Sequence, residues 1–275
     1  MTWGRRCLST ALAGAALCGA VLLGACTTTT TVNGVPQAEG RDRITASDEP
    51  DSTRRARVRM ELATAYFGRG QLTTALDEVK LALQAQPNLV EGYNLRGLIY
   101  AGLNDDTLAQ ESFRRALQIN PRDGDTLHNY GWYQCQQKQY AEAASLFEQA
   151  LTAPQYAGTV RTLLAKGVCQ ARAGQWPEAE ATLTRAYELD PGNAATGVNL
   201  AEVLLRREQY ERARFYIRRV NAVPDQVSAQ TLWLAARIEN KLNNRQGMND
   251  LGRQLRDRFP QSRESSAFDR GQFDE

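Results

Sequence analysis

The chain repeats a pattern of small and helix-breaking residues about every 34 positions. In the unit that covers residues 125–151, the small positions hold Gly131 and Ala143, and Pro154 follows. Each of the three positions recurs six times along the chain: Ala63, Gly97, Gly131, Gly167, Ala201 and Ala235; Ala75, Ala109, Ala143, Ala179, Ala213 and Gly247; Pro87, Pro121, Pro154, Pro191, Pro224 and Pro260. A recurrence of this length predicts an array of stacked supersecondary units.

Each unit is typical of two amphipathic helices in antiparallel contact. Small residues at Gly131 and Ala143 let two helix backbones approach, and Tyr130 and Phe147 fill the seam between them. This is the pattern of the tetratricopeptide repeat (TPR), a helix–turn–helix unit that cannot bury its apolar face alone. We therefore predict an all-α fold, a right-handed α-solenoid of six repeats within residues 56–262: 56–89, 90–123, 124–157, 160–193, 194–227 and 228–261.

The sixth repeat departs most from the pattern, since Gly247 falls inside its second helix. Terminal repeats of a solenoid are atypical because one of their faces meets water. Three apolar residues are expected to cap this open end: Leu255, Phe259 and Phe268. Residues 263–275 are expected to form a polar, frayed tail.

The N-terminus has the character of a secretory signal. Arg5 and Arg6 precede residues 11–25, an apolar run too short for a comfortable membrane span, which ends in Leu-Gly-Ala directly before Cys26. A cysteine in this place resembles a bacterial lipobox, so we expect residues 1–25 to be removed and Cys26 to be acylated. The alternative is ordinary signal cleavage with an incidental Cys26.

Residues 26–55 are predicted to form a flexible tether behind the lipidated cysteine. Five threonines are followed by Asn, Gly, Pro and mixed charges without helical or strand periodicity, a composition that cannot repay its ordering entropy. About 26 extended residues would reach roughly 80–90 Å. Thr27 stands where lipoproteins of the inner membrane often carry Asp, which favours anchoring in the outer membrane, facing the periplasm.

The charge balance and the motif content argue against several classes of function. The 33 Lys and Arg residues include Arg5 and Arg6, so the mature chain keeps 31 against 31 Asp and Glu, which does not favour nucleic acid as a partner. The sequence shows no phosphate loop, dinucleotide fingerprint, nucleophile elbow or metal-binding helix motif, and His128 is its one histidine. We expect no enzyme activity, no metal, no small-molecule substrate and no cofactor besides the lipid on Cys26.

First helices of stacked repeats line a concave groove, and we expect the groove to bind a protein partner. The candidate contacts in the first three repeats form an apolar strip with polar edges: Met60, Phe67, Asn94, Leu98, His128 and Trp132. Such a strip suits a peptide or a helix. For Trp132 the alternative is burial in the stack. His128 is interpreted as a hydrogen-bonding groove residue, with a pH-sensitive group or a metal ligand as alternatives.

Cys135 and Cys169 remain after Cys7 and Cys18 leave with the signal and Cys26 receives lipid. They lie in the first helices of neighbouring repeats, so their Cα atoms are expected within bonding reach. An even pair in an exported chain predicts a disulfide. The alternative is two small buried thiols at helix seams.

Four stretches of the chain resemble the type IV pilus biogenesis lipoproteins of the PilF and PilW family, over about residues 56–264: 129–135, 166–169, 229–234 and 255–262. The resemblance implies a pilotin, which binds the secretin subunit in the periplasm, brings it to the outer membrane and promotes its assembly into a multimeric pore. One alternative is a TPR scaffold lipoprotein for barrel assembly or for the recruitment of peptidoglycan hydrolases. Another is a periplasmic enzyme built on a TPR frame.

Overall fold

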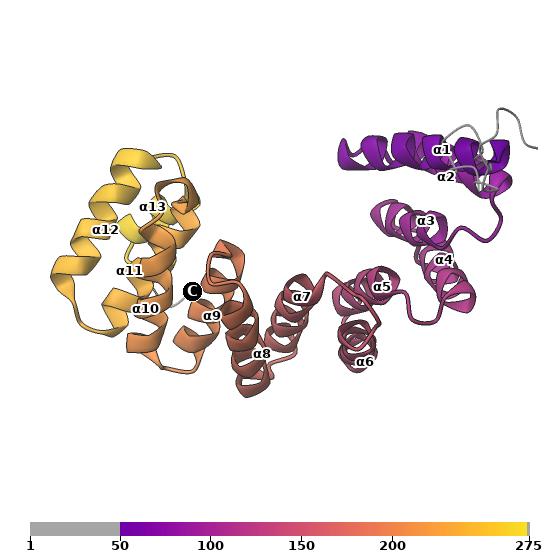
Figure 1. Ribbon diagram of the computed structural model, residues 1–275. Helices are drawn as coiled ribbons and strands as arrows, with labels where there is room; N and C mark the ends of the chain where they lie inside the picture. Colours follow the sequence, from indigo (N-terminus) through magenta and orange to yellow (C-terminus); the bar gives the residue numbers. More distant parts are fainter. Residues whose placement is uncertain (1–49, 274–275) are drawn as a thin grey trace, which may run out of the picture. The chain divides into compact units, whose positions relative to one another are not determined.

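Twelve helices of the computed structural model pair into six hairpins in the predicted order (Figure 1). The structure describes residues 50–273, so the predicted signal peptide, Cys26 and most of the predicted tether lie outside the described residues. The first helices of the repeats are α1 (Asp51–Gly68), α3 (Val90–Gly102), α5 (Gly124–Gln136), α7 (Thr159–Arg172), α9 (Ala194–Arg206) and α11 (Ala229–Lys241). The second helices are α2 (Leu72–Ala85), α4 (Asp106–Ile119), α6 (Tyr140–Leu151), α8 (Trp176–Leu189), α10 (Tyr210–Asn221) and α12 (Arg245–Arg258).

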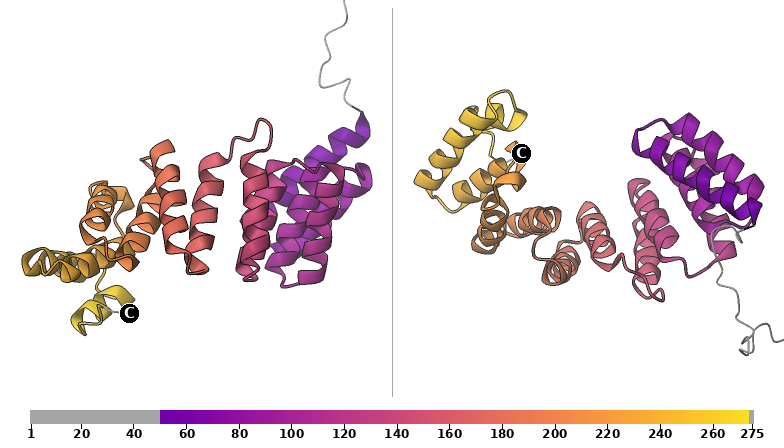
Figure 2. Two further views of the ribbon diagram at one scale, coloured as in Figure 1. Left: turned by 90° about the horizontal axis from the view of Figure 1, so that it is seen from below. Right: turned by 45° about the horizontal axis from the view of Figure 1, so that its top comes forward.

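The hairpins stack in sequence order, as the two views of Figure 2 show. Each second helix packs against the first helix of its own repeat, and in the first five repeats it also packs against the first helix of the next. The first helices also contact one another directly, α3 with α5, α5 with α7, and so on to α11. Because first helices meet first helices, they line the inner side of the stack and the second helices lie outside. The all-α TPR fold is confirmed.

Polar residues cap several helices at their N-termini. The carboxylates of Asp105 and Asp123 accept hydrogen bonds from the amides of Leu108 and Thr126, at 3.1 and 2.8 Å. Ser228 and Thr231 form a reciprocal capping box at the start of α11. Each cap satisfies an amide that has no partner within the helix, so these turns fix where the helices begin.

A residue with left-handed backbone ends the first helix of every repeat. The φ angles lie between 57° and 76° at Gly70, Asn104, Lys138, Gly174, Glu208 and Asn243. The following amide then bonds back to a carbonyl five residues earlier, as in Gln139 N to Gln134 O at 2.9 Å. This closing bond satisfies a carbonyl at the helix end. The turn is the same in all six repeats, although only two of the six residues are glycines.

The predicted register of the sixth repeat is wrong by one residue. In the other five repeats the small residue of the second helix donates its amide to the carbonyl four residues earlier: Ala75 to Gln71, Ala109 to Asp105, Ala143 to Gln139, Ala179 to Gln175 and Ala213 to Gln209. Met248 makes this bond in α12, to Asn244 at 3.0 Å, so it takes the place predicted for Gly247. Correspondingly, Ala236 replaces Ala235. The connection before α11, which contains the short 3₁₀ helix η2 (Pro224–Gln226), is three residues longer than the one before α9, while α10 is two residues shorter than α8, so the sixth repeat is shifted by one residue.

The frayed tail predicted from residue 263 is also corrected. Residues Arg263–Asp269 form a further helix, α13, which packs against α11 and α12. Phe268 on this helix is 9% exposed, and Phe273 stacks on Trp233 with 5.2 Å between ring centroids. The three predicted capping residues all belong to this last cluster, where Leu255 and Phe268 are buried and Phe259 is partly buried. Apolar burial therefore orders a segment whose composition is mainly polar.

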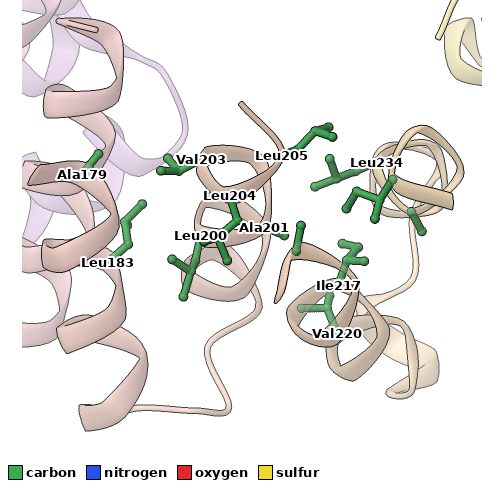
Figure 3. Close-up of a cluster of buried hydrophobic side chains, with 13 residues drawn as sticks. Ala179, Leu183, Leu200, Ala201, Val203, Leu204, Leu205, Ile217, Val220 and Leu234 are labelled. Carbon is green, nitrogen blue, oxygen red and sulfur yellow. The ribbon is translucent and has the colours of Figure 1, made fainter. Parts of the chain in front are cut away.

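Buried apolar clusters follow one another along the stack, so the described residues form a unit with its own continuous core. The largest cluster joins α8 to α11 (Figure 3). In this view α9 lies in the centre, with Leu200 and Leu204 between Leu183 of α8 and Ile217 of α10. These four side chains are fully buried. Consecutive repeats thus complete the core that no single hairpin provides.

Candidate functional site

A groove of about 730 Å³ opens between α1 and the start of α3. Met60 and Leu89 give it an apolar floor, and Thr64 and Ala65 extend the wall formed by α1. Among the predicted partner-binding residues, Met60 is the one that lines it. The groove lies on the first helices, on the inner side of the stack, where a TPR protein receives a peptide or helix.

Charged and polar side chains form the edges of this groove. Arg57 and Glu61 pair across one turn of α1 at 3.2 Å, and Glu91 lines the opposite side. Gln86 donates a hydrogen bond to Thr53 Oγ1 at 2.9 Å, which links the end of α2 to the first turn of α1. An apolar floor with charged edges of both signs suits an amphipathic partner segment.

The other predicted groove residues lie further along the stack and are partly buried in helix seams. Phe67 packs against the cluster of the first repeat, and Leu98 packs against the next one. Asn94 accepts a hydrogen bond from Asn129 Nδ2 at 3.1 Å. Trp132 packs against the Cys135 cluster, and the guanidinium of Arg172 lies 4.9 Å from its ring centroid. The six predicted contacts therefore do not form one continuous open strip.

His128 is not a groove residue, contrary to the prediction. It is 7% exposed and its Nδ1 lies 2.9 Å from Thr162 Oγ1, on the first helix of the next repeat. Tyr156 OH lies 2.7 Å from the same hydroxyl. Burial, and next to it the charge of Arg161, lower the pKa of His128 to about 4, while Asp125 opposes the shift. The imidazole is therefore neutral at pH 7 and joins two repeats.

A disulfide joins Cys135 on α5 to Cys169 on α7, with Cα atoms 5.8 Å apart. Both cysteines are buried, at 1% and 4% exposed, in a cluster with Ala143 and Phe147. The bond links the first helices of the third and fourth repeats. Its oxidation in the cell stays a prediction.

Besides Met60, three lining residues stand at positions of the repeat that usually face the groove: Arg57, Thr64 and Glu91. The sequence reasoning missed the other five: Thr53, Glu61, Ala65, Gln86 and Leu89. Thr53 lies in the start of α1, which begins at Asp51, five residues before the repeat pattern. Gln86 and Leu89 belong to the turn after α2. Asp51 and Arg54 are three residues apart, the spacing at which two charged side chains pair across one helical turn. This spacing is the sequence signal that α1 begins before residue 56.

The described residues offer a binding surface. Between residues 50 and 273, no three His, Cys, Asp or Glu side chains are grouped to hold a metal ion. Within the same range, no helix combines the length and apolar character of a membrane span. What the geometry provides is a preformed groove on a rigid helical stack.

Family models of the tetratricopeptide repeat match residues 90–123, 112–144, 131–194 and 170–232. The chain is therefore a tetratricopeptide repeat protein. It is 24% identical over 209 residues to the type IV pilus assembly protein PilF of Pseudomonas aeruginosa, which covers 76% of this chain and 82% of PilF.

Two solved structures extend the comparison. The crystal structure of PilW, a widely conserved type IV pilus biogenesis factor, matches with a TM-score of 0.71 and 30% identity, over 77% of this chain and 97% of PilW. The structure of Pseudomonas aeruginosa PilF shares the fold, with a TM-score of 0.70 at 21% identity, over 81% of this chain and 100% of that chain. The chain belongs to the PilF and PilW family of type IV pilus TPR proteins.

Proposed function

We propose that this chain is a pilotin for type IV pilus biogenesis. In this role it binds the secretin subunit through the groove between α1 and α3, carries it to the outer membrane and promotes its multimerisation. Family membership supports the link to the pilus. The observation that carries the binding role is the groove itself, with Met60 and Leu89 on its floor and Arg57 and Glu61 at its edge.

Binding and tethering are sufficient for this function, and no chemical step is needed. A lipid on Cys26 would hold the solenoid at the periplasmic face of the outer membrane, with the residues before α1 as a tether. The lipid anchor would then raise the local concentration of a bound secretin subunit near the bilayer. Because the subunit is held by an anchored protein, its encounter with the membrane becomes an intramolecular step. Cys26 is the proposed site of attachment.

The test is the state of the secretin in cells that lack this protein. Membranes are fractionated, and the heat- and detergent-resistant secretin multimer is measured in the outer-membrane fraction. Full-length chains carrying Met60→Glu or Leu89→Glu are then expressed in these cells. We expect them not to restore the multimer, because a charge on the groove floor opposes contact with an apolar side chain of the partner. A Cys26→Ala chain is expected to leave the secretin mislocalised.

Val58→Glu is the matched control. Val58 lies on the same helix and is 44% exposed, but it does not line the groove. It should restore multimers as well as the unaltered chain does. Normal multimers in the outer membrane of the deletion strain would refute the pilotin role, and full rescue by Met60→Glu would refute the groove as the binding site.

A further inference from the structure

The outward face of α10 exposes an aromatic side chain that the fold leaves uncovered. Phe215 is 54% exposed, and it is the one aromatic residue between 50 and 273 that is classed as exposed rather than partly or fully buried. Its ring lies edge-on to the ring of its neighbour Tyr216, with 5.1 Å between centroids. An exposed phenylalanine ring is a candidate anchor point for a partner.

Arginines surround this ring. The guanidinium of Arg219 lies 5.6 Å from the ring centroid of Phe215, and within residues 50–273 Arg219 has no carboxylate partner. Arg218 is 60% exposed along its side chain, although it donates a hydrogen bond to the buried Glu239 at 2.7 Å. Arg214 also pairs with Glu239, at 3.8 Å. These ion pairs hold the two arginines as walls beside the ring.

Two hollows meet at Arg219. One, of about 480 Å³, is lined by Phe215 and Ala222, by three arginines, and by Glu211, which pairs with Arg214 and leaves Arg218 and Arg219 as the remaining arginines of this hollow. The other, of about 260 Å³, lies on the far side of Arg219 and is lined partly by Val223, which is 43% exposed. The surface thus presents an apolar group and a cation on α10, Phe215 and Arg219, and a second apolar group, Val223, two residues past the end of the helix.

Positive charge is concentrated on this part of the outer surface. Helix α10 carries four Arg and one Glu, net +3, and α12 carries four Arg and two Asp, net +2. The two second helices before them are acidic: α6 carries two Glu, net −2, and α8 carries three Glu and one Arg, net −2. Carboxylates of neighbouring helices offset part of this charge, since Arg212 pairs with Glu180 and Arg218 pairs with Glu239. Within residues 50–273, Arg219 is the arginine of α10 that stays without such a partner, so the local positive charge centres on it.

We propose that this face is a second protein-docking surface, which takes an acidic, extended segment of a partner protein. Phe215 and Val223 are eight residues apart. Helix α10 ends at Asn221, but Ala222 keeps helical backbone and Val223 N donates to Val220 O at 3.1 Å, so the span stays near the roughly 12 Å of eight helical residues, which an extended chain covers in about four residues. The fitting pattern is therefore an apolar residue, an Asp or Glu two positions later to meet Arg219, and a second apolar residue two positions further on. Side-chain-sized hollows with fixed walls favour such a segment over a flat lipid surface. This surface is separate from the groove between α1 and α3.

The test uses residues 50–275, which contain the complete core, and three labelled peptides. The probe has the one-letter sequence DFEEELD; DAEEEAD lacks its apolar residues, and KFKKKLK reverses its charge. Binding is measured by fluorescence anisotropy at low and physiological salt. We expect DFEEELD to bind tightest, and Arg219→Glu and Phe215→Ala each to weaken it by about tenfold, as removal of an interface anchor does. DAEEEAD should bind weakly, and Phe215→Ala should not change its affinity.

Arg122→Glu, an exposed arginine in the turn after α4, is the charge-matched control and should change nothing. Met60→Glu should leave peptide binding unaltered, so this inference and the pilotin role fail independently. Equal binding of DFEEELD and KFKKKLK, or no effect of Arg219→Glu, would overturn the proposal. Vesicles of phosphatidylglycerol and phosphatidylethanolamine form the last arm. Binding to vesicles that depends on Arg219, without binding to DFEEELD, would identify a lipid surface in place of a peptide.

Discussion

Phe268 of α13 occupies the space that Gly252 leaves open in α12. A Cβ atom on Gly252 would overlap the Phe268 ring. In the four preceding repeats the equivalent residue of the second helix is large and fully buried: Phe113, Phe147, Leu183 and Ile217. In the sixth repeat this residue is a glycine, and the large side chain comes from a different helix. Phe268 and Ala236 share one buried cluster, so α13 completes the last repeat.

The replacement of Phe268 by Ala is expected to destabilise the end of the stack. Loss of a buried phenylalanine costs about 3–5 kcal/mol, and the lower part of this range applies because Phe268 keeps a small exposed fraction. Since each repeat contacts only its neighbours, the effect should be local. Hydrogen exchange should show α12 and α13 losing protection while α3 to α6 keep theirs.

Two further variants separate packing from helix propensity. Ser266→Ala, an exposed change on α13, should leave exchange unaltered. Gly252→Leu combined with Phe268→Ala should be more stable than Phe268→Ala alone, because a leucine at 252 restores the arrangement of the other repeats. A Phe268→Ala protein with unchanged exchange in α12 would show that α13 does not complete the repeat.

Helix pairs, order and small positions could be predicted because close packing demands particular residues. A Cβ on Gly97 would lie 2.7 Å from Phe113, so glycine is needed opposite phenylalanine. The register of the sixth repeat could not be predicted from spacing. Ala235 and Ala236 are adjacent, so a step of 34 residues ends on an alanine although the true position is one residue later. Only the backbone bond of Met248 distinguishes them.

The candidate site was predictable only in part. Met60 follows from its position in the repeat, whereas Thr53 and Leu89 come from a helix extension and a turn that the repeat pattern does not describe. His128 is predicted to face the groove because it stands at a position of the first helix that usually does so in this type of repeat. Its partner, Thr162, comes from the next repeat, and such a tertiary hydrogen bond makes burial acceptable.

Gly167→Ala is predicted to destabilise the fourth repeat. A Cβ at this position would lie 2.6 Å from Leu183 Cγ, a branched carbon that is fully buried and cannot move freely. Overpacking of this kind costs about 1–3 kcal/mol. Urea unfolding of residues 50–275 measures the loss. In a Leu183→Ala background, which lacks the clashing Cγ, Gly167→Ala should cost less than it does in the unaltered chain.

Gly68→Ala is the matched control for that experiment. Gly68 is the last residue of α1, and no atom lies within 4 Å of a Cβ placed on it. This substitution should be neutral or stabilising by up to about 1 kcal/mol, because alanine is the better helix former. Equal destabilisation by both changes would contradict the close-packing argument.

The disulfide between Cys135 and Cys169 is predicted to be oxidised in the exported protein and to stabilise it. The bond joins residues 34 apart, and closing such a loop contributes about 4 kcal/mol in the chain-entropy estimate. Alkylation in denaturant without reductant should label neither thiol by mass spectrometry, because both cysteines are buried in the folded protein and only an unfolded chain exposes any free thiol. The Cys135→Ala, Cys169→Ala variant should lose a similar free energy of unfolding, and labelling of both thiols of the unaltered protein in denaturant would refute the prediction.

His128 is predicted to make stability depend on pH in mildly acidic solution. Its pKa is about 4 in the folded chain against an ordinary 6.5, so between these values the unfolded chain binds more protons. The contribution of His128 to the free energy of unfolding is therefore fully present above pH 6.5 and decreases as the pH drops towards 4. Between pH 7.5 and 5 the free energy of unfolding should fall by about 2 kcal/mol. Since His128 is the one histidine of the chain, the change is isolated by comparison with His128→Gln. Urea midpoints at pH 7.5, 6 and 5 should fall less steeply for this variant, because carboxylates titrate in both proteins and the imidazole in only one. Parallel curves for the two proteins would show that His128 is not held neutral between the third and fourth repeats.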